Sequence, residues 1–170
     1  EGFVGYDDLK VSTWVSKYRK VTAKGKEQYQ LVLAKTPFYA ESGGQTGDTG
    51  TLDFGGSVIP VTDTRKENEL IIHFTPALPA DLSVPVEAKV NPEARMNTMY
   101  NHTATHLVHA ALRKVLGTHV AQKGSLVNPQ QLRFDFSHFE KVSEAQLREV
   151  EWMVNEKIRE NIPVVIRSMN

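Results

Sequence analysis

A change of sequence pattern at Asn91 constrains the fold more than any other feature of this chain. Asn91, Pro92 and Glu93 are typical of a helix start, because Asn caps well, Pro fits the first helical position and an acid suits the first turn. This pattern predicts a helix that runs to Gly117, a residue type that often ends helices. Before Asn91, short apolar runs alternate with glycine and proline. The chain therefore combines a strand-rich part with a helical part.

Residues 1–90 have the pattern of a small all-β unit. Apolar and polar residues alternate over residues 11–16, as expected for a strand with one buried face. Further candidate strands lie at residues 29–34, 58–61, 70–74 and 84–90. Glycines and prolines separate these runs at the spacing of a small barrel or sandwich. We predict a small, barrel-like β module.

Residues 91–170 favour a mixed helix and strand arrangement. Two strands are predicted at residues 124–127 and 132–137, and Ser143 with Gln146 forms a capping box that starts a second helix. The apolar stripe of that helix has four members, Leu147, Val150, Val154 and Ile158. A last strand is predicted to begin at Val164–Ile166. The whole chain is thus predicted to be α+β, with a β-rich unit at 1–90 and an α+β unit at 91–170.

Two histidines on the first predicted helix are the first chemical signal. His102 and His106 are four residues apart, so their imidazoles lie about one turn apart on one helix face and can reach a single zinc ion. His109 shares that face but lies about 10.5 Å from His102 along the axis. Zinc proteases of the related pattern have Glu where this chain has Thr103. Spacing alone leaves two interpretations open, metal ligands or ordinary polar side chains.

The number of ligands limits the metal interpretation. Structural zinc needs four protein ligands and catalytic zinc needs about three. The chain has no cysteine, which also excludes disulfides and a thiol nucleophile. Beyond the three helix histidines, only His73, His119 and His138 are present, and no spacing singles one of them out.

A glycine-rich run, TPFYAESGGQTGDTG at residues 36–50, is the second signal. It lacks the lysine and the spacing of a phosphate-binding loop. One interpretation is a tight hairpin connection in which glycine supplies a positive φ. The other is a pocket wall, where a small ligand meets backbone amides together with Gln45 and Thr46.

Charge limits the partners. The chain has 20 basic and 20 acidic residues, and strong independent binders of nucleic acid are usually basic. Any RNA contact is therefore expected to be local. A basic cluster sits near the start of the chain, and we favour a solvated strand surface over an RNA contact for its members, Lys17, Tyr18, Arg19, Lys20, Lys24 and Lys26. No apolar run approaches the roughly 20 residues of a membrane span.

Taken together, four segments resemble the editing domain of alanyl-tRNA synthetases. These are FVGYD at 3–7, the glycine-rich run at 36–50, NHTATHLVHAALRKVLGTHVAQKGSL at 101–126 and LRFDFSHF at 132–139. The resemblance covers essentially the whole chain, and the combination of GGQ with HTATH is much more specific than either motif alone. It implies a barrel-like module joined to an α+β editing core of the type shared with threonyl-tRNA synthetases.

The resemblance also implies an activity and a site. The activity is hydrolysis of the ester in Ser-tRNA(Ala) and Gly-tRNA(Ala), at the acceptor end of tRNA(Ala), in the cytoplasm, without membrane or DNA partners. In the family, zinc is held by H-x-x-x-H and a later C-x-x-x-H. His102 and His106 match the first pair, and the second pair is absent, so we expect a chain truncated before it. ATP and Mg belong to an aminoacylation domain that this chain lacks.

Candidate site residues follow from these considerations. We expect Gly43, Gly44, Gln45 and Thr46 to bind substrate, His102 and His106 to bind zinc, and His109 to act as a general base. A polar pocket can retain serine and reject alanine, because alanine leaves its hydrogen-bonding groups unpaired. Two alternatives are a free-standing trans-editing hydrolase and a non-catalytic module that positions the tRNA acceptor end.

Overall fold

The computed structural model describes residues 2–23, 25–163 and 165. The strands before Asn91 are β1 (Gly2–Phe3), β2 (Lys10–Thr13), β3 (Val15–Ala23), β4 (Lys26–Leu33), β5 (Lys35–Thr36), β6 (Gly50–Asp53), β7 (Val58–Val61), β8 (Asp63–Glu67), β9 (Leu70–Thr75) and β10 (Val86–Val90). The elements after it are α1 (Pro92–Leu116), β11 (Ala121–Val127), β12 (Leu132–Ser137) and α2 (Glu144–Arg159). The α+β class is confirmed.

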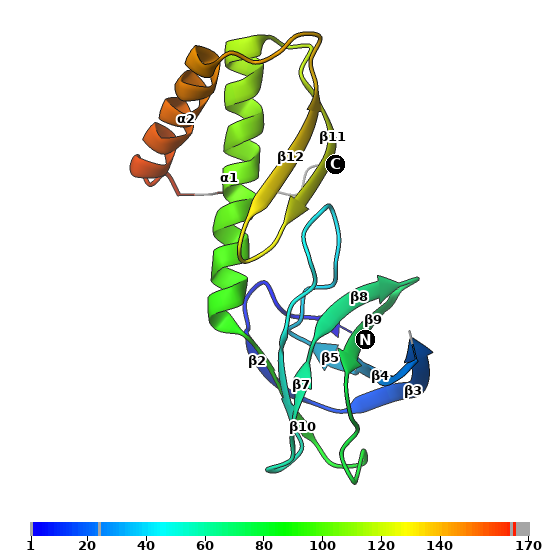
Figure 1. Cartoon of the computed structure of the whole chain (residues 1–170). Helices are drawn as coiled ribbons and strands as arrows, with labels where there is room; N and C mark the ends of the chain where they lie inside the picture. The colour runs from blue at the N-terminus through cyan, green and yellow to red at the C-terminus, as the bar shows by residue number, and fades with distance from the viewer. Residues whose placement is uncertain (1, 24, 164, 166–170) are drawn as a thin grey trace.

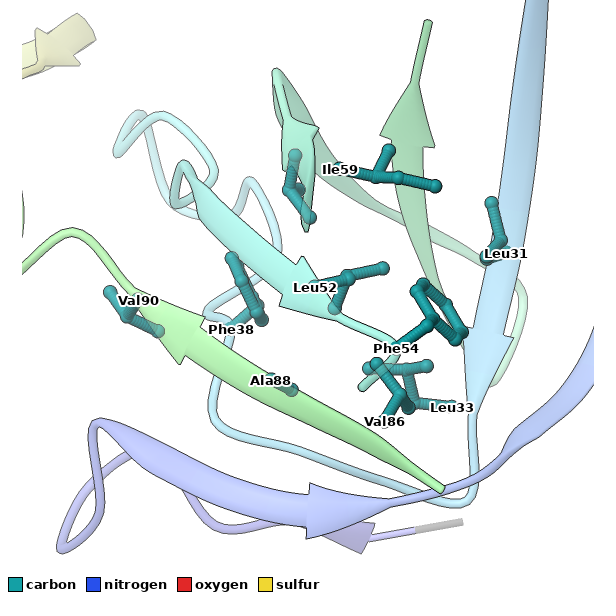
Figure 2. Close-up of a cluster of buried hydrophobic side chains, with 10 residues drawn as sticks. Leu31, Leu33, Phe38, Leu52, Phe54, Ile59, Val86, Ala88 and Val90 are labelled. Carbon is teal, nitrogen blue, oxygen red and sulfur yellow. The ribbon is translucent and has the colours of Figure 1, made fainter. Parts of the chain in front are cut away.

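The strands before Asn91 form two four-stranded antiparallel sheets and one short parallel pair. The orders are β2-β10-β6-β7 and β3-β4-β9-β8, and β1 pairs with β5. One core lies between the sheets: Leu31 and Leu33 from β4 meet Leu52 from β6 and Val86 from β10 (Figure 2). Phe38, from the start of the glycine-rich run, is fully buried in the same core. The run is therefore anchored at its first end.

The alternation over residues 11–16 belongs to two strands rather than one. The chain leaves β2 at Thr13 and enters β3 at Val15, which lies in the other sheet. Trp14 sits at this corner, and its carbonyl accepts a hydrogen bond of 2.9 Å from the Ala34 amide. A period of two persists through such a corner, so the pattern alone does not reveal it.

The long helix α1 has the predicted start and end. The Asn91 side chain accepts a hydrogen bond from the Ala94 amide, Pro92 is the first helical residue, and Gly117 caps the carboxyl end with φ of 118°. In Figure 1, α1 rises from the sheets with α2 on one side and the β11–β12 hairpin on the other. The helix therefore joins the sheet half to a second, smaller packing unit.

That unit has its own core, made by α1, α2 and the hairpin. Its buried members are Ala111, Leu112, Val120 and Val150, with Phe134 and Phe136 of β12 packed against them. The capping box of Ser143 and Gln146 is present as predicted. The predicted stripe is only partly correct: Val150 and Val154 pack inward, whereas Leu147 and Ile158 are about half exposed. Tyr100 of α1 is exposed as well.

The basic cluster lies mostly on β3 and is partly neutralised by its neighbours. Lys20 pairs with Glu27 of the neighbouring strand β4, and Arg19 pairs with Glu67 of β8, the opposite edge strand of the same sheet; all four side chains are exposed. The interpretation as a solvated strand surface is supported by these pairs. Lys24 lies outside the described residues, and so does the predicted strand at Val164–Ile166 apart from Val165, which is in neither helix nor strand. No helix in the described part of the chain is long and apolar enough to cross a membrane.

Candidate functional site

The glycine-rich run folds into a two-residue turn at its tip. Ser42 and Gln45 exchange both backbone hydrogen bonds, at 3.1 and 3.0 Å. Gly43 and Gly44, the two residues between them, have φ of 60° and 84°. Positive φ at both central positions is the geometry of the tight hairpin turn that favours glycine. The hairpin interpretation is therefore confirmed for these four residues.

The same run bridges the sheets and the hairpin beside α1. On one side the Glu41 amide donates to the Thr64 carbonyl of β8, at 2.9 Å. On the other side the Thr46 amide donates to the Val127 carbonyl of β11, at 2.9 Å, and the Val127 amide donates to the Gly44 carbonyl, at 2.8 Å. The run is thus held by hydrogen bonds on both sides, which fixes the backbone on either side of Gln45.

Gln45 meets the first histidine of the pair. The amide oxygen Oε1 of Gln45 lies 2.6 Å from Nδ1 of His102, although the two residues are 57 positions apart. Gln45 is buried and His102 is half-buried. The loop and the histidine-bearing face of α1 therefore converge.

The separation of the two stacked imidazoles matches that of two ligands on one metal ion. The ring centroids of His102 and His106 are 5.1 Å apart. Two imidazoles on one tetrahedral zinc, with Zn–N bonds of about 2.0–2.1 Å, place their centroids about 5 Å apart. Burial, and secondly the proximity of His106, lower the pKa of His102, which favours the neutral imidazole that a metal requires. The donor chemistry of this pair fits zinc.

The described residues supply only part of a zinc site. Within them, no group of three or more His, Cys, Asp or Glu side chains lies close enough to hold a metal ion. The pair therefore accounts for two ligands of the three or four that zinc uses. Any further ligand has to come from outside residues 2–23, 25–163 and 165.

The other histidines lie elsewhere. The ring of His109 packs 5.0 Å from that of Phe134, and its Nε2 is buried with no hydrogen-bond partner in the part that the structure describes. His73 is fully buried in β9. His119 and His138 contact each other, with 2.8 Å between Nε2 and Nδ1. His119 follows the far end of α1, roughly 21 Å along the axis from His102.

A buried ion pair beneath the loop was not predicted. Arg95, in the first turn of α1, donates from Nε to both carboxylate oxygens of Asp48, at 3.1 and 3.0 Å, and also pairs with it through Nη2. The same guanidinium donates to the Gly5 carbonyl at 2.6 Å and to the Pro37 carbonyl at 2.9 Å. Asp48 also accepts the Tyr39 amide at 2.7 Å. The end of the glycine-rich run is thereby fixed to the base of the helix that carries the histidines.

Substitution of Gly44 by alanine is expected to destabilise the fold more than substitution of Gly43, although both residues have positive φ. A Cβ at Gly44 would lie 2.2 Å from Oγ and 2.7 Å from the carbonyl oxygen of Ser125, whereas a Cβ at Gly43 would meet no atom within 4 Å. Gly43→Ala is expected to cost about 1–2 kcal/mol of folding free energy, from left-handed strain alone. Gly44→Ala is expected to cost about 1–3 kcal/mol more, from overpacking. Urea unfolding of both variants checks this, and equal losses would contradict the docking of the loop on β11.

The family model that describes tRNA synthetases class II (A) matches residues 1–95. The chain belongs to the alanyl-tRNA synthetases. The alanine–tRNA ligase of Cytophaga hutchinsonii is 65% identical over 160 residues, which is 94% of this chain and 18% of the relative. The corresponding ligase of Parabacteroides distasonis is 52% identical over 162 residues, covering 95% of the chain and 19% of the relative.

A third alanine–tRNA ligase, from Salinibacter ruber, is 53% identical over 162 residues and covers 95% of the chain. The chain spans less than a fifth of the length of each of these curated relatives, 17–19%. Most of an alanyl-tRNA synthetase of that length therefore lies outside the sequence described here.

Proposed function

We propose that this chain is the editing part of an alanyl-tRNA synthetase and hydrolyses the ester of Ser-tRNA(Ala) and Gly-tRNA(Ala). The observation that carries the proposal is the contact of 2.6 Å between Gln45 Oε1 and His102 Nδ1. It joins the glycine-rich loop and the histidine pair, the two motifs that make the resemblance to editing domains specific. The parent protein is then an ATP-dependent alanine–tRNA ligase of the cytoplasm, whose remaining domains use ATP and Mg.

Selectivity for serine follows from the polarity of the loop. Serine exceeds alanine by one hydroxyl, which an apolar synthetic pocket rejects only weakly, by about 10²-fold. A polar pocket reverses this preference, because alanine leaves its hydrogen-bonding groups unpaired. We assign four groups to this pocket: the backbone amides of Gly43 and Gly44, the side-chain NH₂ of Gln45 and the hydroxyl of Thr46. The Thr46 hydroxyl donates to the Val127 carbonyl at 3.3 Å, so its oxygen can accept a hydrogen bond from a substrate hydroxyl.

His102 and His106 are the residues that we assign to zinc, with the remaining ligands supplied by the longer parent protein. When bound, zinc supplies a Lewis acid that polarises the ester or orients the amino group of the substrate. The chain itself holds His102 on a fixed helix and fixes its ring by the contact with Gln45. We retain His109 as the candidate general base, since its buried Nε2 has no partner among the described residues. The acceptor end of tRNA(Ala) is the expected partner.

Deacylation of Ser-tRNA(Ala) by the full-length protein tests this proposal. His102→Ala is expected to abolish ester hydrolysis and leave alanylation of tRNA(Ala) unchanged, because only the editing chemistry depends on this imidazole. His119→Ala is the matched control, since that histidine lies roughly 21 Å away along the helix axis, and it is expected to retain hydrolysis.

Two other results of the deacylation assay would contradict parts of the proposal. If the full-length wild-type protein leaves the seryl ester intact, the editing proposal is wrong and a non-catalytic role in tRNA positioning is favoured. If the 170-residue chain alone hydrolyses the ester at the full-length rate, the expectation that further ligands are needed is wrong, and a free-standing hydrolase is favoured instead.

A further inference from the structure

Gln45 is buried, and hydrogen bonds hold the backbone at Gln45 itself and at the residues on either side of it. Its own amide donates to Ser42, the next amide donates to Val127, and the preceding carbonyl accepts from Val127. The residue as a whole is only 6% exposed. Loops generally run over the protein surface, and their side chains are usually more accessible than this. The packing therefore points to a partner inside the protein.

That partner is His102, and the contact determines the chemistry of the ring. An amide oxygen can only accept hydrogen bonds, so the 2.6 Å contact with Gln45 Oε1 requires a proton on Nδ1 of His102. In the neutral ring the other nitrogen, Nε2, then carries the free lone pair. Without this acceptor, neither tautomer is imposed and the ring is free to turn about its side-chain bonds.

We propose that Gln45 is a positioning residue that fixes the tautomer and the orientation of His102, so that Nε2 faces the metal site. This inference rests on the proposed function, because it takes His102 to be a metal ligand. It changes the role expected for Gln45: the amide oxygen acts through His102 rather than through the substrate hydroxyl. Gly44 and Thr46 serve the same end, since their hydrogen bonds to β11 hold the Gln45 backbone in place.

The physical reason is the one that governs outer-sphere partners of metal-binding histidines. A histidine that donates its second ring N–H to an oxygen is held in one tautomer and one orientation and becomes a better ligand. Loss of such a partner typically weakens metal binding 10–100-fold. The same range is expected here.

The first test needs no metal. Long-range ¹H–¹⁵N NMR of the 170-residue chain at pH 8 reports which nitrogen of His102 carries the proton. The wild-type chain is expected to show the Nδ1–H tautomer. If His102 carries its proton on Nε2 in the wild-type chain, the inference is wrong, whatever the variants do.

The second test compares three variants of the chain in the same NMR experiment, and the same variants of the full-length protein in zinc titrations against a chromophoric chelator. Gln45→Met keeps the length and removes the acceptor, so it is expected to lose the Nδ1–H preference and to bind zinc 10–100-fold more weakly. Gln45→Glu keeps an acceptor oxygen and is expected to retain both properties. Gln130→Met, in an exposed loop position, is the matched control and is expected to match the wild type within twofold.

The outcomes separate the positioning role from the proposed function. If Gln45→Met changes the tautomer but the full-length wild-type protein binds no zinc through His102 and His106, the positioning role stands and the metal assignment fails. If Gln45→Met binds zinc as well as the wild type does, the proposed role toward the metal fails even though the zinc site stands. If Gln45→Met does not fold, the positioning role is still tested by two results. It fails if the wild-type chain carries the His102 proton on Nε2, or if Gln45→Glu loses the Nδ1–H tautomer.

Discussion

Replacing Arg95 with methionine is expected to lower the free energy of unfolding by about 3–5 kcal/mol. Both Arg95 and Asp48 are buried, and the guanidinium also satisfies the carbonyls of Gly5 and Pro37. Removing the cation leaves the Asp48 carboxylate uncompensated in a low-dielectric environment, together with two carbonyls that have lost their donor. Urea unfolding followed by circular dichroism measures the loss.

A surface pair provides the control for this prediction. Arg133 binds Asp135 at 3.1 Å, but the two side chains are 61% and 45% exposed. Because water screens this pair, Arg133→Met is expected to change the unfolding free energy by no more than about 1 kcal/mol. The double variant Arg95→Met with Asp48→Asn is expected to recover part of the loss, since no charge is then left buried. Equal effects of Arg95→Met and Arg133→Met would show that the buried pair contributes nothing particular to stability.

Acid is expected to destabilise the chain through His73. This ring is fully buried, and burial lowers its pKa to about 4 from the ordinary 6.5, despite the contact with the Leu31 carbonyl. Its Nδ1 donates to Leu31 at 3.0 Å, and its Nε2 lies 2.7 Å from the Thr36 hydroxyl. The folded chain therefore holds a neutral ring at a pH where the unfolded chain already binds a proton.

The direction of the pH effect follows from proton linkage. Above pH 6.5 the ring is neutral in both states, and the contribution of His73 to stability is complete. Between pH 6.5 and about 4 the unfolded state binds more protons, so stability falls with pH, and the total loss from this ring is about 3 kcal/mol. Below about 4 both states are protonated and the loss stops increasing.

Two measurements check the assignment to His73. Urea unfolding from pH 7 to pH 4 is expected to show a much shallower loss in His73→Gln, whose amide can donate to Leu31 and accept from Thr36 without titrating. An NMR titration of the wild-type chain follows the ring directly. A His73 ring that titrates near 6.5 in the folded protein would contradict the prediction.

Elements with strong local signals were predictable from the sequence. The bounds of α1 follow from Asn91, Pro92 and Gly117, and β12 occupies the predicted residues 132–137. Capping and alternation act over a few residues, so a single sequence contains the information. The α+β class followed from the same signals.

Features that depend on distant residues were not predictable. The pair of Arg95 and Asp48 joins positions 47 apart, and nothing in either local segment indicates the partner. The corner at Trp14 was missed because alternation continues through it. Leu147 is about half exposed, and its exposure depends on which part of α2 the rest of the fold covers, which periodicity does not encode.

The sequence singled out the residues of the candidate site but did not predict the contacts between them. Residue types at Gln45, His102 and His106 marked a loop and a helix face, and their convergence is present in the structure. The substrate and metal roles remain predictions. Sequence alone gave no means of showing that the Gln45 oxygen is already engaged by His102, because that depends on the bridge between β8 and β11.

The double attachment of the glycine-rich loop has a mechanical consequence. The loop is hydrogen-bonded to β8 on one side and to β11 on the other. A small rotation of the helical half against the sheets would therefore have to deform the loop. Such a rotation would strain the tip and turn the amide that contacts His102, so any movement between the two halves would also move the imidazole ring.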